Sequence, residues 1–325
     1  MVRQFVKAAN SVAAGSSFLA GIMLRRPVIT GMPPAISFEL TNHCNLSCPE
    51  CASGSGQMTR ERGFMEPSLF ERTMAEIRSY LYYVSLYFQG EPMMHPDFFS
   101  FTRSRGGDVR IIVSTNGHFL DGADADKIAR SGIHKLIVSL DGMTRDTYEL
   151  YRLNGDFEKV VSGIRNVSSS IKSSGSRMKL EIQFLVNRFN EHQTGEAKKF
   201  ADEVNASLRL KSMQVISVKD TYSWMPSIEK FRRYTGSGEE TTVKGTLPDR
   251  CLRLYLNPVV TWDGKVIPCC FDKDADHIMG DLTKDSFRAI WHGEKYRAFR
   301  KAVLTGRKSI EICRNCTSGL KGVIY

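Results

Sequence analysis

Three cysteines lie within eight positions of each other in the stretch TNHCNLSCPEC, residues 41–51. Thiolates bind zinc and iron–sulfur clusters, and a closed tetrahedral site needs four ligands. Cys44, Cys48 and Cys51 are one ligand short, and no fourth cysteine lies nearby in the sequence. The C-x3-C-x2-C spacing therefore predicts either a zinc site or an iron–sulfur cluster whose remaining iron is open to a small ligand.

A second set of cysteines near the end of the chain is complete. It consists of Cys251, Cys269, Cys313 and Cys316. The dipeptide Asp263–Gly264 between two β-prone runs is a hairpin signal, and this hairpin would return Cys269 to the side of Cys251. Four thiolates can close a zinc site or an iron–sulfur site, and the spacing alone does not choose between them.

The remaining cysteine, Cys270, directly follows Cys269. Neighbouring residues of a strand face opposite sides, so we expect Cys270 to be a buried thiol outside the ligand set. A long cysteine-free stretch, residues 52–250, separates the two sets. A secreted disulfide framework would be denser, and no secretory signal precedes the cysteines. We therefore expect metal sites in a protein of the reducing cytoplasm.

The composition is that of an ordinary globular protein, with 42% hydrophobic and 25% charged residues and a formal net charge of +10. A basic surface favours anionic partners. The basic residues are scattered and form no nucleic-acid-binding motif, so we expect a small-molecule substrate and no nucleic acid. No run reaches the roughly 18–20 apolar residues of a transmembrane helix. Residues 4–24 predict an amphipathic helix that caps the fold, with contact at a membrane surface as the alternative.

From residue 35 onwards, short β-prone runs alternate with segments of helical periodicity. The predicted strands are residues 35–41, 84–88, 110–115, 135–140, 179–186 and 208–215, and the predicted helices are residues 67–81, 124–133, 157–171 and 192–204. Near-continuous apolar strands that alternate with helices are typical of a parallel sheet buried on both faces. Six such units predict an α/β fold built as a partial (β/α)6 barrel.

This fold places the first cysteine set in the loop that leaves the first strand, at the carboxyl end where barrels carry their chemistry. Four regions follow from the pattern. Residues 1–34 are expected to form an N-terminal helical extension and residues 35–216 the barrel. Residues 217–250 contain many Gly, Ser, Thr and Pro residues and are expected to form a linker or cover, and residues 251–325 a small cysteine-rich domain.

At this point the chain resembles the radical S-adenosylmethionine (SAM) superfamily. The resemblance covers nearly everything from residue 36 onward and rests on motifs that follow successive strands in the family's order. These are CNLSCPEC at 44–51, QGEP at 89–92, STNG at 114–117, SLDG at 139–142 and TYELYR at 147–152. Several motifs in one order are far more specific than any one of them alone.

The resemblance implies a [4Fe–4S] cluster on Cys44, Cys48 and Cys51, with SAM bound to the open iron. Reductive cleavage of SAM then gives a 5′-deoxyadenosyl radical, which abstracts hydrogen from the substrate. Glu91 would pair with the methionine ammonium of SAM, because a carboxylate pairs well with an ammonium. The full set of implied SAM contacts is Gly90, Glu91, Pro92, Ser114, Asn116 and Ser139.

Two positions depart from the family's pattern. Gln89 stands where the first glycine of the second motif is usual, and Glu50 stands where many members have an aromatic residue. Neither change removes a cluster ligand. Four other residues, Arg152, Tyr222, Trp224 and Tyr234, lie in regions that could face the cavity, although packing or surface positions are the plainer interpretation. No residue is assigned as a catalytic base.

The tail resembles a shortened SPASM domain, the twitch form. This implies a second, auxiliary [4Fe–4S] cluster on Cys251, Cys269, Cys313 and Cys316. The chain is similar to the 2-deoxy-scyllo-inosamine dehydrogenase and anaerobic sulfatase-maturing families of radical SAM enzymes. The resemblance therefore implies an oxidoreductase that oxidises a small polar molecule and passes one electron to the auxiliary cluster. A flavodoxin or ferredoxin would supply the reducing electron.

Two alternatives stay open. The first is a radical SAM maturase that modifies a peptide or protein, and the second is a non-enzymatic zinc or electron-carrier protein. The roughly 35 residues before the barrel are too few for a leader-peptide-binding module, which argues against the maturase. The open ligand position of the first cysteine set argues against the carrier, which gains nothing from a vacant position.

Overall fold

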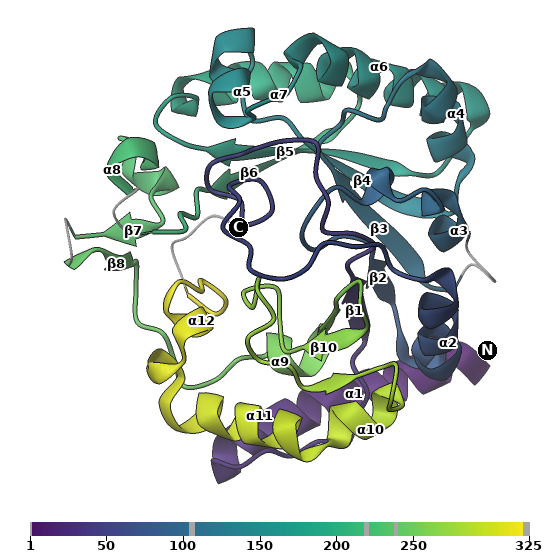
Figure 1. Cartoon of the computed structure of the whole chain (residues 1–325), viewed down its shortest axis with the longest axis vertical. Coiled ribbons are helices and arrows are strands. Elements are labelled where there is room, and N and C mark those ends of the chain that lie inside the picture. The colour runs from purple at the N-terminus through teal and green to yellow at the C-terminus, as the bar shows by residue number, and fades with distance from the viewer. Residues whose placement is uncertain (1, 104–107, 218–220, 237–239, 321–325) are drawn as a thin grey trace.

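Six parallel strands, hydrogen-bonded in chain order, form the centre of the molecule (Figure 1). They are β1 (Ala35–Phe38), β2 (Tyr83–Ser85), β3 (Arg110–Thr115), β4 (Ile133–Ser139), β5 (Lys179–Val186) and β6 (Ser207–Ser212). The computed structural model describes residues 2–103, 108–217, 221–236 and 240–320 of the chain. With helices outside the strands, this arrangement confirms the predicted partial (β/α)6 barrel.

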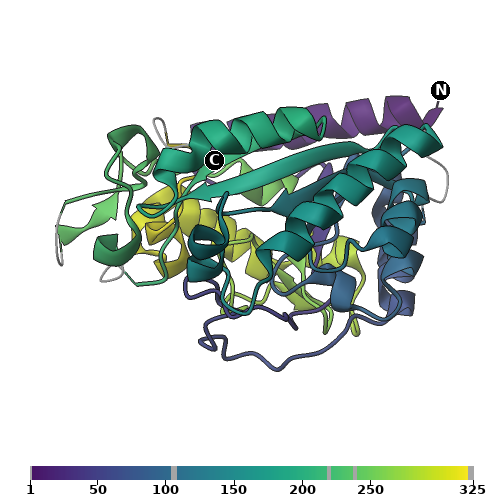
Figure 2. The ribbon, with the colours of Figure 1, turned by 90° about the horizontal axis from the view of Figure 1, so that it is seen from above.

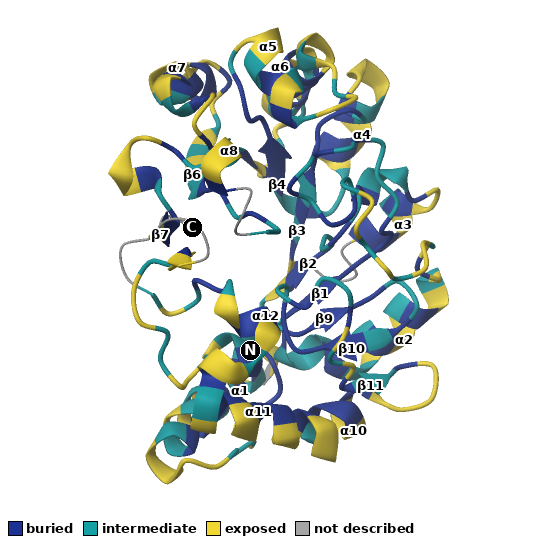
Figure 3. Ribbon diagram, turned by 60° about the vertical axis from the view of Figure 1, so that its left-hand side comes forward, coloured by how far each residue is buried: buried dark blue, intermediate teal, exposed yellow. Residues whose placement is uncertain are grey.

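Helices cover the outer side of this sheet. They are α2 (Pro67–Ile77), α3 (Phe98–Thr102), α4 (Gly122–Arg130), α5 (Arg145–Tyr151), α6 (Phe157–Ser174) and α7 (Thr194–Glu203). Strand residues that face them are apolar and fully buried, as Val113, Val138 and Ile182 show. These side chains join the inner sides of the helices in one core, so buried residues follow the strands and the facing sides of the helices (Figure 3).

Local signals set the helix ends. Asp121 caps α4 and Asp156 caps α6, because each carboxylate accepts a hydrogen bond from the backbone N–H three residues later. Gly175, with a φ of +65°, ends α6 in the left-handed conformation. Helix α5 was not predicted, because its seven residues are too few to show a clear helical period.

The first two strands end earlier than the sequence predicted. β1 ends at Phe38 and β2 ends at Ser85, whereas strands to residues 41 and 88 were expected. Beyond β1 the chain bonds to a neighbouring loop, where Thr41 Oγ1 donates to the carbonyl of Gly63 over 2.7 Å. The residues after both strands are thereby available to form loops at the carboxyl edge of the sheet.

The tail continues the same sheet. β9 (Val259–Val260) pairs in parallel with β1, β10 (Lys265–Ile267) pairs antiparallel with β9, and β11 (Gly280–Asp281) pairs antiparallel with β10. The predicted hairpin is confirmed, and Gly264 in its turn has a φ of +86°. Within the described residues the sheet thus has nine strands, in the order β11-β10-β9-β1-β2-β3-β4-β5-β6.

Four tail helices lie on the side of the molecule opposite the helices α5 to α7 (Figure 1). They are α9 (Arg253–Leu256), α10 (Phe287–His292), α11 (Glu294–Gly306) and α12 (Glu311–Arg314). Before them come α8 (Thr221–Trp224) and the strand pair β7 (Tyr234–Thr235) and β8 (Thr242–Val243), in the region expected to be a linker or cover. Residues 218–220 and 237–239 of that region lie outside the described residues.

Helix α1 (Val2–Leu24) lies along the outer edge of the molecule (Figures 1 and 2) and confirms the predicted N-terminal helix. A pair of hydrogen bonds fixes its inner side. Asn10 Nδ2 donates to the carbonyl of Met32 over 2.9 Å, and the N–H of Met32 donates to Asn10 Oδ1 over 2.8 Å. None of the helices in the described ranges is both long and apolar enough to cross a membrane.

Candidate functional site

The loop after β1 carries Cys44, Cys48 and Cys51 at the carboxyl end of the parallel strands (Figure 2). Cys48 is buried, the other two are half-buried, and all three pack in one cluster with Leu46. Burial raises the pKa of Cys44 to about 11, and the charges of Glu91 and the two other thiols add to the rise. A bound metal cluster favours the thiolate form, so three crowded thiols suit a cluster of positive charge.

Backbone contacts fix the path of this cysteine loop. The N–H of Ser47 donates to the carbonyl of Leu153 over 3.0 Å, and the N–H of Cys51 donates to the carbonyl of Cys48 over 3.2 Å. Gly54 passes so close that a Cβ there would lie 2.6 Å from the backbone nitrogen of Cys48. The chain therefore needs glycine at this point to fold back on the C-x2-C turn.

The QGEP motif lies directly against the cysteine loop. Gly90 has a φ of +74°, and a Cβ there would lie 2.5 Å from the carbonyl oxygen of Thr41. The N–H of Gly90 donates to Ser53 Oγ over 2.9 Å, and the N–H of Glu91 donates to the carbonyl of His43 over 2.8 Å. Only glycine allows this close approach, so the motif joins the loops of β1 and β2.

The Glu91 carboxylate is buried between the second and third loops. Oε1 accepts hydrogen bonds from Thr115 Oγ1 over 2.8 Å and from the N–H of Met93 over 3.1 Å, and Oε2 accepts one from the N–H of Asn116 over 2.6 Å. Pro92 opens the single 3-10 turn that Glu91 caps. Burial raises the pKa of Glu91 to about 7 despite these bonds, so a nearby cation would favour its ionised form.

The other predicted contacts lie at the ends of β3 and β4. Asn116 Nδ2 donates to Asn45 Oδ1 over 2.7 Å and lies 3.9 Å from the Sγ atom of Cys44, so it contacts the cysteine loop directly. Ser114 is half-buried on β3, and Ser139 is buried at the end of β4, opposite Gln183. The structure therefore brings Glu91 and Asn116 together, whereas the two serines lie on neighbouring strands.

A buried ion pair next to Cys48 was missed by the sequence analysis. Arg152 donates to Asp141 from Nε over 2.7 Å and from a terminal nitrogen over 2.6 Å, and its other terminal nitrogen lies 3.8 Å from the Sγ atom of Cys48. Asp141 also accepts a hydrogen bond from the N–H of Leu185 over 2.6 Å. Asp141 belongs to the SLDG motif and Arg152 to the TYELYR motif that follows it. A carboxylate at the end of a strand, with an arginine in the next motif, was the sequence signal that could have predicted this ion pair.

Both departures from the family pattern have structural roles. Gln89 Oε1 accepts a hydrogen bond from Ser53 Oγ over 3.2 Å. Glu50 is buried, and its Oε2 accepts a hydrogen bond from the N–H of Ile216 over 2.6 Å. These contacts tie the cysteine loop to the loop of β2 and to the chain beyond β6.

The second cysteine set comes together as expected. Cys251, Cys269, Cys313 and Cys316 line one cavity, together with apolar side chains such as Phe299. Cys269, Cys313 and Cys316 are buried, and burial raises the pKa of Cys316 to about 11. Four thiols around one apolar cavity form a donor set that suits an iron–sulfur cluster or zinc.

A single ion would require tight convergence of these donors. Within the described ranges, no three His, Cys, Asp or Glu side chains are arranged to hold one metal ion.

A buried arginine also accompanies the second set. Arg307 lies 3.4 Å from Cys316 Sγ through one terminal nitrogen, and it donates to the carbonyls of Arg250 over 2.8 Å and Ser318 over 3.1 Å. It is 1% exposed. Burial alone would lower the pKa of Arg307, but the charges of Cys251, Cys316 and Cys313 raise it. Arg307 is therefore placed to balance negative charge on these thiolates.

The remaining residues from the sequence analysis lie elsewhere. Tyr222 is 59% exposed, and Trp224 packs edge-on against Tyr151 with ring centroids 5.3 Å apart. Tyr234 is buried and donates to Asn315 Oδ1 over 2.7 Å. These three residues contact the surface or the surrounding protein, in line with the plainer interpretation.

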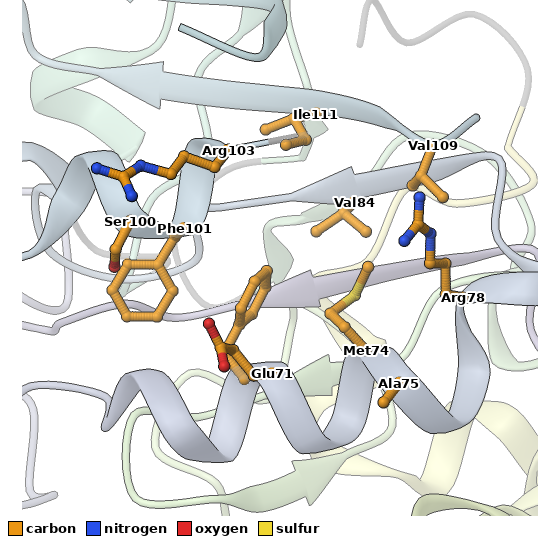
Figure 4. A pocket seen from close by; sticks show the side chains of 11 residues that line it. Glu71, Met74, Ala75, Arg78, Val84, Ser100, Phe101, Arg103, Val109 and Ile111 are labelled. Atoms are coloured by element: carbon orange, nitrogen blue, oxygen red, sulfur yellow. The ribbon is translucent and has the colours of Figure 1, made fainter. Parts of the chain in front are cut away.

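A separate pocket opens on the outer side of the sheet, between α2 and α3 (Figure 4). Its lining includes Met74, Arg78, Val84, Phe101 and Val109. None of the eight cysteines lines this pocket. It is thus distinct from both cysteine sites.

Comparison with known proteins agrees with this geometry. A family model described as the radical SAM superfamily matches residues 38–180, and one described as an iron–sulfur cluster-binding domain, SPASM, matches residues 251–317. The AdoMet-dependent heme synthase of Methanosarcina barkeri is 30% identical over 312 residues, which cover 84% of this chain and 85% of that protein.

Two further similarities extend over most of the chain. The S-adenosyl-L-methionine-dependent 2-deoxy-scyllo-inosamine dehydrogenase of Niallia circulans is 22% identical over 87% of this chain and 92% of that protein. The crystal structure of BtrN in complex with AdoMet and 2-DOIA has a TM-score of 0.57 and 20% identity, over 90% of this chain and 95% of that chain. The latter shows a shared fold. The matched domains identify SAM and two [4Fe–4S] clusters as the cofactors.

Proposed function

The chain belongs to the radical SAM superfamily, and from this premise we propose that it is an oxidoreductase that removes two electrons from a small polar molecule. One observation carries the proposal. The first cysteine set offers three thiols, and the second offers four thiols around one cavity. An open site suits SAM, whereas a closed site has no position for a substrate and suits electron transfer.

In this proposal, Cys44, Cys48 and Cys51 would hold the first cluster, and the iron without a protein ligand would be free to bind SAM. Glu91 would accept a hydrogen bond from the amino group of SAM, and its raised pKa supports this role because the positive charge of SAM would favour the charged carboxylate. Gly90, Pro92, Ser114, Asn116 and Ser139 form the rest of the SAM contacts. Reductive cleavage of bound SAM would supply the radical that abstracts a hydrogen atom from a carbon of the substrate.

The second set completes the electron balance. Cys251, Cys269, Cys313 and Cys316 hold the auxiliary cluster. The substrate loses one hydrogen atom from carbon to the deoxyadenosyl group, one proton from its hydroxyl or amine to a base, and one electron to the auxiliary cluster. A flavodoxin or ferredoxin supplies the electron that cleaves SAM. These reduced thiols fit the cytoplasm.

Two relatives are consistent with a small molecule as the substrate. The heme synthase and the 2-deoxy-scyllo-inosamine dehydrogenase both act, by their names, on small molecules, and both match over most of this chain. The second of these names describes a dehydrogenation, which is the reaction class proposed here.

The test is anaerobic reconstitution followed by reduction. We expect about eight irons per chain from two four-iron clusters, and formation of 5′-deoxyadenosine from SAM. With 2-deoxy-scyllo-inosamine as the first candidate substrate, the oxidised product should appear in equal amount to 5′-deoxyadenosine. Bound zinc without SAM cleavage would overturn the proposal. Cleavage that is stimulated only by a peptide would replace the small molecule with a peptide substrate.

A further inference from the structure

His118 directly follows the STNG motif, and its buried imidazole ring lies in the loop between β3 and α4. Two contacts hold the ring. The backbone N–H of Asp156 donates to Nε2 over 2.9 Å, and Nδ1 lies 3.1 Å from Oδ1 of Asn116. Asp156 is the residue that caps α6. The ring therefore connects the start of α6 with Asn116, which contacts the first cysteine loop.

These two contacts determine which ring nitrogen of His118 carries the hydrogen. A backbone N–H can only donate, so Nε2 accepts from Asp156 with its lone pair and carries no hydrogen. In a ring of this kind the hydrogen is on Nδ1, which then donates to Oδ1 of Asn116. Burial lowers the pKa of His118, which favours the neutral ring that this arrangement requires.

The acceptor atom of Asn116 is identified without the ring. The backbone N–H of His118 donates to the same atom over 3.0 Å, so this atom is the oxygen of the amide and not its nitrogen. A bond from an Asn oxygen to the N–H two residues later is an ordinary Asx turn. The bond from Nδ1 is a second restraint on the same oxygen, and it comes from a side chain that is itself fixed to α6.

Held by its oxygen, the Asn116 amide turns its nitrogen towards the first cysteine set. Nδ2 donates to Asn45 Oδ1 over 2.7 Å and lies 3.9 Å from Cys44 Sγ. The backbone N–H of Asn116 donates to Glu91 Oε2 over 2.6 Å. If the amide rotated by half a turn, its oxygen would face the oxygen of Asn45 and the bond to the cysteine loop would be lost.

We propose that His118 is a positioning residue of the SAM site. Its Nδ1–H fixes the Asn116 amide, and Asn116 in turn holds the cysteine loop and the Glu91 carboxylate in the places that SAM binding needs. This inference rests on the proposed function, because it adds a residue to the same site. Within the described residues, His118 makes no hydrogen bond to a cysteine or to Glu91, so it acts through Asn116.

Nitrogen-15 NMR of the reconstituted protein, labelled at its seven histidines, tests the position of the hydrogen. We expect a histidine signal with hydrogen on Nδ1 and none on Nε2, and this signal should be missing from the spectrum of His118→Asn. The measurement does not depend on SAM cleavage. A His118 ring with its hydrogen on Nε2 would overturn the inference, because Nδ1 could not then donate to Asn116.

Two variants divide the contacts of the ring between them. An asparagine side chain places an amide donor near the position of Nδ1, whereas the longer glutamine side chain places an amide oxygen near the position of Nε2. His118→Asn should therefore keep the bond to Asn116 and lose the bond from Asp156, and His118→Gln should do the reverse.

Equilibrium dialysis of SAM against the reconstituted variants measures the consequence. The dissociation constant of SAM should rise about fivefold in His118→Gln, as expected for the loss of one hydrogen bond, and should stay near that of the wild type in His118→Asn. His134→Gln is the control and should bind SAM as the wild type does, because His134 lies at the amino end of β4, at the opposite edge of the sheet from the cysteine loop.

Urea unfolding of both His118 variants shows whether each of them folds. Equal weakening of SAM binding in the two variants would contradict the positioning role and would assign the ring to the support of α6. Unchanged SAM binding in both variants would contradict it as well. SAM cleavage by the wild type is measured alongside. Cleavage with one SAM affinity in all variants defeats only this inference, whereas SAM binding that depends on His118 without any cleavage defeats the proposed function.

Discussion

The two cysteine sets differ in how the charge around them is balanced. Each has a buried arginine beside a thiol, Arg152 at Cys48 and Arg307 at Cys316. The charge of Arg152 is neutralised by Asp141 at 2.6 Å. Arg307 is hydrogen-bonded to carbonyls and a thiol, and among the described residues it forms no ion pair. The closed set has one more thiolate and receives the uncompensated cation.

This difference fits opposite electronic roles. Each electron added to a cluster adds negative charge, so an uncompensated cation nearby favours the reduced form and raises the reduction potential. Beside Cys48, the positive charge of Arg152 is compensated by Asp141, so Arg152 favours the reduced form of the first cluster less than Arg307 favours that of the second. In the proposed function, the second set accepts an electron, and the cation of Arg307 fits that role. The comparison therefore supports electron flow from substrate to the second site.

The largest expected effect is that loss of a cysteine stops a different reaction in each set. Cys44→Ala should abolish formation of 5′-deoxyadenosine, because the open cluster loses a ligand. Cys313→Ala should retain SAM cleavage at least in part and stop substrate oxidation, because the electron acceptor is lost. Chromatographic assay of 5′-deoxyadenosine and of product checks both variants. If both variants lost cleavage equally, the tail would be only a structural support.

The next effect is a difference in protein stability between variants that lack one or the other arginine. Arg152→Met leaves the carboxylate of Asp141 buried without its cation and should lower the unfolding free energy by about 3–5 kcal/mol. Arg307→Met leaves no carboxylate behind, so its loss should be smaller. Urea unfolding of the cluster-free protein measures both, and Asp141→Asn combined with Arg152→Met should restore part of the loss. Equal losses for the two single variants would remove the distinction.

A third effect concerns the pH dependence of the unfolding free energy, which Glu91 beside the first cysteine set should dominate. Burial raises the pKa of Glu91 from 4.5 in the unfolded chain to about 7. The native state thus binds more protons between these values, and stability falls as pH rises from 4.5 to 7 and is level above. The total contribution is about 3 kcal/mol.

Glu91→Gln should remove this slope in the unfolding free energy of the cluster-free protein. Glu311→Gln is the control. It removes an exposed carboxylate near Cys313 and should leave the slope of unfolding free energy against pH unchanged. A slope unchanged by Glu91→Gln would show that another group titrates.

The smallest effect concerns the potential of the auxiliary cluster. Arg307→Gln removes a buried cation and should make that potential more negative by about 60 mV, equivalent to a tenfold change in a one-electron equilibrium. Arg307→Lys keeps the charge and should shift it less. Redox titration followed by electron paramagnetic resonance measures both variants. A shift of equal size in the first cluster would contradict a local effect.

Sequence patterns predicted the barrel because each central strand is an apolar run followed by a helix of clear period. The motif loops were predicted for a similar reason, since cysteines and glycines at fixed spacing leave few possible paths. The ion pair of Asp141 and Arg152 was not predicted, because its contact depends on how α5 folds back on β4. The continuation of the sheet into the tail was also missed, since the two residues Val259 and Val260 are too few to form a pattern.

The parallel pairing of β9 with β1 has a consequence for electron movement. The strand that leads to the first cysteine loop is hydrogen-bonded to the hairpin that leads to Cys269. The separation of the two clusters is therefore set by a shared sheet and not by the docking of a mobile module. In the proposed function, an electron would therefore pass from substrate to acceptor over a distance that the sheet keeps constant.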